Sequence, residues 1–66
     1  MENLFLNRLK IEKDDLLDKV TKLAIFLNSD KVNGLSDAND LLLKQQLEAM
    51  NDYLNILIIR IELLEK

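Results

Sequence analysis

The stretch from Tyr53 to Leu64 is too apolar to be an ordinary surface helix. A surface helix carries apolar side chains along one stripe and polar side chains elsewhere. Here eight of twelve residues are leucine or isoleucine, and they cover almost the whole circumference of a helix. A chain of 66 residues can place only one face of this helix against its own partner helix. The sequence therefore predicts that other copies of the chain, another protein or a membrane cover the remaining apolar face.

Composition narrows the ways in which so small a chain is stabilised. Domains of this size usually rely on disulfides, metals or oligomer formation. The chain contains no cysteine and no histidine, which excludes disulfides and removes the commonest transition-metal ligand. We therefore expect a single helical domain over residues 1–66, with no metal and no other cofactor, that gains stability by self-association.

The charged residues argue against a membrane and against long nucleic acids as partners. Arg60 and Glu62 interrupt the apolar stretch, and a membrane span needs about 20 mostly apolar residues. The N-terminal residues lack the basic segment and apolar core of a signal peptide, so we expect a soluble, cytoplasmic protein. The net charge of −3 disfavours the many phosphate contacts that hold long nucleic acids. A small anionic ligand in a local basic pocket stays compatible with this charge.

A single cluster of turn-forming residues divides the chain. It surrounds Gly34, the only glycine of a chain that contains no proline. We expect a helix at about residues 2–28, a loop at about 29–36 and a helix at about 37–65. Ser36 is a suitable N-cap for the second helix, and Asp37 and Asp40 place negative charge at the positive end of its dipole.

Apolar residues recur at alternating steps of three and four in both predicted helices, the spacing of helices that pack nearly parallel or antiparallel. The first seam has one polar member and comprises Leu6, Leu9, Lys13, Leu16, Val20, Leu23 and Leu27. The second comprises Leu43, Leu47, Met50, Leu54, Leu57, Ile61 and Leu64, and beside it runs a second row, Leu42, Ala49, Ile56 and Leu63. We predict an all-α fold, an antiparallel two-helix hairpin that assembles into a helical homo-oligomer. One row faces the first helix, and the other faces another subunit.

Signals of catalysis are nearly absent. The Ser-His, Cys-His and di-iron constellations all need residues that this chain lacks. Asp14 and Asp15 are adjacent in the sequence, so they do not face each other on a helix. We expect solvated surface carboxylates there, and a protein that is not an enzyme.

Basic residues are better candidates for a site, and Lys22 and Arg60 stand out. Most helix-1 lysines fit a charged face, with stabilising pairs at Asp15–Lys19 and Asp18–Lys22. Lys22 lies beside the seam, where its stem could pack at a subunit boundary and its ammonium could reach a phosphate.

Arg60 stands alone among isoleucines. It either reaches solvent or pairs with Glu62 or Glu65 of a neighbouring chain, or it contributes to a ring of arginines around an anion. Of the aromatic residues, Tyr53 flanks the seam, where a core or interface role with a hydrated hydroxyl is expected. Phe5 lies near the N-terminus, where it could pack on a neighbour or stack on a base.

Several short motifs in this order resemble a known family. They are Lys-Leu-x-x-Phe from Lys22, Leu-Leu-x-x-Gln in helix 2, Met-x-x-Tyr from Met50, and Arg-Ile at Arg60. Together with the stretch from Arg8 to Lys13 in helix 1, they resemble the small phage proteins of the anti-CBASS cyclic-nucleotide sponge family, and the resemblance covers nearly the whole chain.

The resemblance implies compact helical oligomers, typically hexamers, that bind cyclic di- and trinucleotides made by host defence enzymes without cleaving them. It implies that Lys22 meets a ligand phosphate between subunits. The family's base-stacking aromatic falls near Asn7, and Phe5 is the closest aromatic here, which is a departure from the family pattern. Arg60 matches an arginine that could serve a separate trinucleotide site.

Two functional hypotheses follow. In the first, a phage anti-defence protein sequesters cyclic oligonucleotides in the host cytoplasm. Lys22 and Arg8 hold phosphate, Phe5 or Asn7 contacts bases, and Arg60 lines a second site. In the alternative, a small helical adaptor docks on a partner protein through helix 2.

Overall fold

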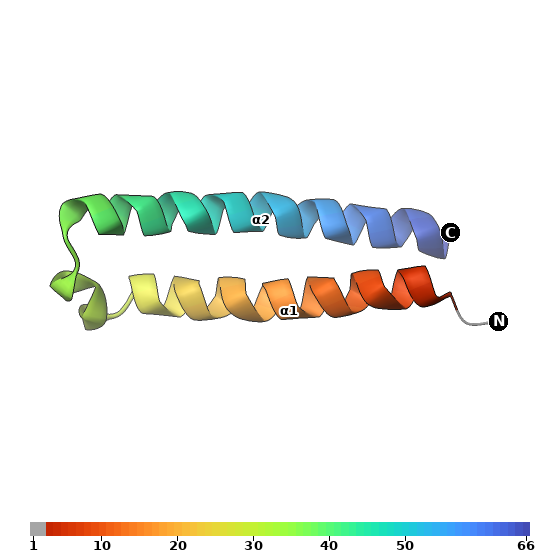
Figure 1. The fold of residues 1–66 in the computed structure, drawn as a ribbon, viewed down its shortest axis with the longest axis horizontal. Coiled ribbons are helices and arrows are strands. Elements are labelled where there is room, and N and C mark those ends of the chain that lie inside the picture. The colour runs from red at the N-terminus through yellow and green to blue at the C-terminus, as the bar shows by residue number, and fades with distance from the viewer. Residues whose placement is uncertain (1–2) are drawn as a thin grey trace.

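The computed structural model describes residues 3–66 as two long antiparallel helices joined by a short turn (Figure 1). Helix α1 spans Leu4–Leu27, helix α2 spans Asp37–Glu65, and a 3₁₀ turn, η1, spans Asp30–Gly34. The hairpin is a rod with extents of 50 × 15 × 13 Å. The prediction of an all-helical, two-helix chain is confirmed, with no strand in residues 3–66. The expected helix start at Glu2 lies outside the described residues.

Side chains cap both helices at their first turns. The Asn3 side-chain oxygen accepts a hydrogen bond of 3.0 Å from the backbone N–H of Leu6. The Ser36 hydroxyl accepts one of 3.2 Å from the backbone N–H of Asn39, so the predicted N-cap of the second helix is confirmed. Each cap satisfies one of the amides that a helix start leaves without a partner.

The end of α1 is also held by hydrogen bonds. The Asn28 side-chain amide donates to the Ala24 carbonyl at 2.9 Å, and the Ser29 hydroxyl donates to the Phe26 carbonyl at 2.7 Å. The η1 turn that follows gives Gly34 no left-handed backbone angle. Polar residues, rather than a strained glycine, therefore make the connection.

The core is a narrow seam between the helices. Leu57 is completely buried at 0% exposure and clusters with Leu9 and Ile61, while Leu6 and Leu16 pack against them. Every predicted seam residue of α1 is buried or half-buried, including Lys13. In α2 the same holds except for Leu64. This residue is exposed, since it lies in the last turn of α2, at the open end of the hairpin where α1 begins. The predicted seams are confirmed apart from this residue.

The second apolar row of α2 is uncovered within the chain. Its members, Leu42, Ala49, Ile56 and Leu63, are all exposed. A single hairpin therefore covers one row only, as the sequence predicted. In the described part of the chain, neither helix has an apolar stretch long enough to cross a lipid bilayer.

Truncation of Leu57 tests the seam. We expect Leu57→Ala to lower the free energy of unfolding by about 2–5 kcal/mol, because it leaves a cavity at the most buried position. Leu41→Ala is the matched control, since Leu41 is exposed on the same helix. Urea unfolding followed by circular dichroism measures both changes. Equal losses for the two variants would contradict the assignment of Leu57 to the core.

Candidate functional site

Phe5 and Arg60 meet at the open end of the hairpin. Phe5 lies in the first turn of α1 and Arg60 in the C-terminal part of α2. The Arg60 guanidinium carbon lies 5.9 Å from the centre of the Phe5 ring, at the outer limit of a cation–π contact. Two residues predicted for ligand binding are thus brought together across the helices. A half-exposed ring and a guanidinium suit a base and a phosphate, respectively.

Arg8 lines an open groove on one side of the hairpin. The groove has a volume of about 380 Å³ and combines cationic, acidic and apolar side chains. Its lining comprises Arg8, Ile11, Glu12, Asp15, Leu16, Lys19 and Tyr53. The Tyr53 hydroxyl donates a hydrogen bond to the Glu12 carboxylate, which ties the two helices together at this groove. Arg8 therefore lies beside a polar cross-helix contact that is about two helical turns from the Phe5–Arg60 pair.

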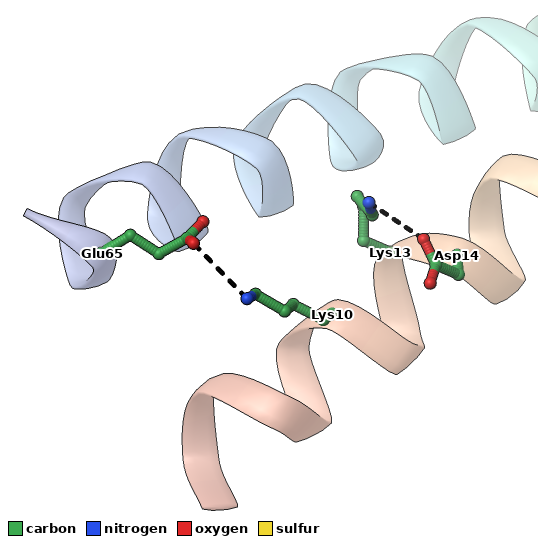
Figure 2. A network of polar contacts seen from close by, with 4 residues as sticks. All are labelled: Lys10, Lys13, Asp14 and Glu65. Carbon is green, nitrogen blue, oxygen red and sulfur yellow. Dashed lines mark ion pairs between the residues drawn. The ribbon is translucent and has the colours of Figure 1, made fainter. Parts of the chain in front are cut away.

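A second cross-helix contact lies near the end of α2. The Lys10 ammonium is 3.4 Å from a Glu65 carboxylate oxygen, whereas Lys13 pairs with its neighbour Asp14 at 2.9 Å on α1 (Figure 2). Both ion pairs are partly solvent-exposed, so each adds little stability. Because Glu65 pairs with Lys10, its carboxylate is engaged within the chain.

Lys22 lies far from the other candidates. Its side chain is 75% exposed, and its ammonium pairs with Asp18 at 2.9 Å, so that predicted pair is confirmed. Lys22 follows Arg8 by 14 residues, which is about 21 Å along a helix. One chain alone therefore does not bring Lys22 to the Phe5–Arg60 end.

The remaining predicted features are Asn7 and the Asp15–Lys19 ion pair. Asn7 is exposed, and its backbone N–H donates to the Asn3 carbonyl at 3.0 Å. The predicted Asp15–Lys19 ion pair is wrong: within residues 3–66 the two side chains make no such contact, and both line the groove instead. Their i,i+4 spacing permits a pair, but exposed side chains gain little by holding one geometry.

The family is shown by the sequence. The profile of the Sequestin family matches residues 3–63, which span α1, η1 and nearly all of α2. The chain belongs to the Sequestin family. No curated protein and no solved structure matches it.

Three cross-helix contacts of this Sequestin-family chain were not predicted, and the position of the loop signals two of them. In an antiparallel hairpin, the numbers of facing residues add up to a constant. The ends of the predicted loop, 29 and 36, add up to 65, as do Phe5 with Arg60 and Glu12 with Tyr53. Both pairs follow from this register once the turn is placed, whereas the numbers of Lys10 and Glu65 add up to 75 and their contact does not follow from it.

Acidic side chains do not gather into a metal site in this Sequestin-family chain. Across residues 3–66, no three carboxylates lie close enough together to hold a metal ion. The candidate residues can supply stacking and charge-assisted hydrogen bonds.

A double-mutant cycle tests the Phe5–Arg60 contact. We expect Phe5→Leu and Arg60→Met to show a coupling of about 0.5–1 kcal/mol in urea unfolding, the usual size of an exposed cation–π contact. Phe5→Leu combined with Lys44→Met is the control, because Lys44 pairs with Asp40 near the other end of the hairpin. A coupling of zero in the first cycle would show that the ring and the guanidinium do not interact in solution.

Proposed function

We propose that this chain is a phage anti-defence protein that binds cyclic di- and trinucleotide signals in the host cytoplasm and withholds them from their receptors. The observation that carries the proposal is the Sequestin match over residues 3–63, because the family's name is that of a protein that sequesters a ligand. The stretches that resemble cyclic-nucleotide sponges lie within those residues, from Arg8 to Ile61.

The roles that we propose for the side chains agree with their exposure. The ammonium of Lys22 and the guanidinium of Arg8 bind phosphate, and Phe5 or Asn7 contacts a base. All four residues are exposed. The Lys22–Asp18 pair is also exposed, so exchanging Asp18 for a ligand phosphate costs little. Arg60 serves a second site for trinucleotides, where its guanidinium can bind phosphate oxygens in a bidentate manner.

Self-association completes the site in this proposal. Arg8 and Lys22 are about 21 Å apart along α1, so their side chains do not meet within one chain. Copies of the chain, which we expect to form a hexamer, can place Lys22 of one subunit near the open end of another. A symmetric oligomer builds such clefts from few residues per chain. The ligand is held without cleavage, a role that needs no nucleophile and no metal.

Calorimetry with a cyclic dinucleotide and a cyclic trinucleotide tests the function. We expect saturable binding of at least one ligand, and we expect Lys22→Ala to weaken dinucleotide binding about tenfold or more through loss of a charge-assisted contact. Lys31→Ala is the matched control, since Lys31 is an exposed lysine in η1. After prolonged incubation with the protein, chromatography should recover the ligand intact.

The outcomes separate the parts of the proposal. No heat with any cyclic nucleotide at protein concentrations well above micromolar would refute the function. Full binding by Lys22→Ala would leave the function standing and remove Lys22 from the site. Binding accompanied by ligand breakdown would replace sequestration with catalysis.

A further inference from the structure

The Lys22 ammonium is paired with a carboxylate of its own helix. It lies 2.9 Å from an Asp18 carboxylate oxygen, and the i,i+4 spacing places both side chains on one side of α1. Side-chain exposures of 75% and 62% leave both groups open to a ligand. A phosphate that binds Lys22 therefore binds beside a negative charge.

Asp18 stays close to the site after a ligand arrives. Both residues lie within one continuous helix, α1, so their backbones remain one turn apart. A phosphate oxygen bonded to an ammonium lies about 2.7–2.9 Å from its nitrogen. The phosphate and the carboxylate are then on the order of 6 Å apart, which is less than the Debye length of about 8 Å at physiological salt. The two charges therefore repel each other with little screening.

The surroundings of Asp18 do little to offset this repulsion. Ile11 and Ile25 lie seven positions before and after Asp18, so all three share the outer side of α1. Both isoleucines are exposed, at 61% and 65%. Among residues 3–66, the ion pair with Lys22 is the one that Asp18 makes. A phosphate that takes over Lys22 removes this ion pair from Asp18.

The repulsion from Asp18 grows with the charge of the phosphate. A phosphodiester, as in a cyclic oligonucleotide, carries one negative charge. A terminal phosphate monoester carries about 1.5 to 2 negative charges at pH 7. An ammonium alone attracts the monoester more strongly, because Coulomb energy is proportional to the product of the charges. A carboxylate beside the ammonium opposes that preference.

We infer that Asp18 determines the selectivity of the Lys22 site by disfavouring phosphate monoesters relative to phosphodiesters. The inference rests on the proposed function and names the class of nucleotide that the site rejects, which is any nucleotide that ends in a phosphate monoester. Hydrolysis of one phosphodiester bond in a cyclic dinucleotide adds one water and leaves a terminal monoester and a hydroxyl. The site therefore holds the intact cyclic ligand in preference to its opened form.

Calorimetry at low ionic strength with two matched ligands tests the inference. The probes are a cyclic dinucleotide and the linear dinucleotide of the same bases with a terminal phosphate. We expect Asp18→Asn to lower the Kd of the linear ligand about threefold more than that of the cyclic ligand, which corresponds to one additional charge at about 6 Å in water. Asp18→Glu retains the charge and should keep the wild-type ratio. Added salt should reduce the effect of Asp18→Asn.

Asp40→Asn is the matched control. Asp40 pairs with Lys44 at the same i,i+4 spacing and the same distance of 2.9 Å, but on α2. It should leave the ratio of the two Kd values unchanged. Circular dichroism should report the same helix content for all the variants.

A smaller pair of probes tests the Lys22 contact directly. Dimethyl phosphate is a diester, and methyl phosphate is a monoester, so neither brings a base or a second phosphate. In titrations followed by the NMR signal of the Lys22 side chain, Asp18→Asn should shift the ratio of the two affinities toward methyl phosphate, again about threefold.

The outcomes separate the inference from the function. No binding of a cyclic dinucleotide or trinucleotide by the wild-type chain would overturn the function and the inference with it. Cyclic-ligand binding with a Kd ratio that Asp18→Asn leaves unchanged would overturn the inference alone. An equal change of the ratio in Asp18→Asn and Asp40→Asn would also overturn it, because the effect would then come from net charge and not from the Lys22 site.

Discussion

The packing of Leu57 against Leu9 and Ile61 is the constraint on which the rest of the hairpin depends. With few other buried side chains, this cluster fixes how the helices are aligned along their length. That alignment places Phe5 opposite Arg60 and Glu12 opposite Tyr53. A slip of one helical turn, about 5.4 Å, would separate both pairs while leaving each helix intact. The packing of the seam therefore sets the alignment of the helices, and the cross-helix contacts follow from that alignment.

The sequence predicts most of this fold because its apolar spacing is regular and its turn residues are confined to one place. Residues such as Leu9, Val20 and Leu54 lie on seams that the spacing identifies without knowledge of the partner helix. Leu64 is the exception, because its burial depends on how far α1 extends rather than on its own spacing. The exposure of Ile56 was likewise predictable, since a lone hairpin has only one inner face.

The candidate site was less predictable, and the reason is physical. The meeting of Phe5 and Arg60 depends on the register across the turn, which spacing within one helix does not report. Lys22, by contrast, pairs with Asp18, one turn away on its own helix, which the spacing within that helix does predict. The helical pattern of one chain does not predict the contacts of Lys22 with a ligand or with a second subunit. The Sequestin profile supplies a family for these residues but no geometry.

The hairpin brings the start of α1 and the end of α2 to the same end of the rod (Figure 1). A purification tag or a fluorescent fusion at either terminus therefore stands beside Phe5 and Arg60, and could mask the contacts under study. The opposite end, at η1, is about 50 Å away along the rod. A label attached to exposed Lys31 or Asn33 would report on binding and assembly from a distance. For this molecule, where a probe is attached decides whether it observes the open end or obstructs it.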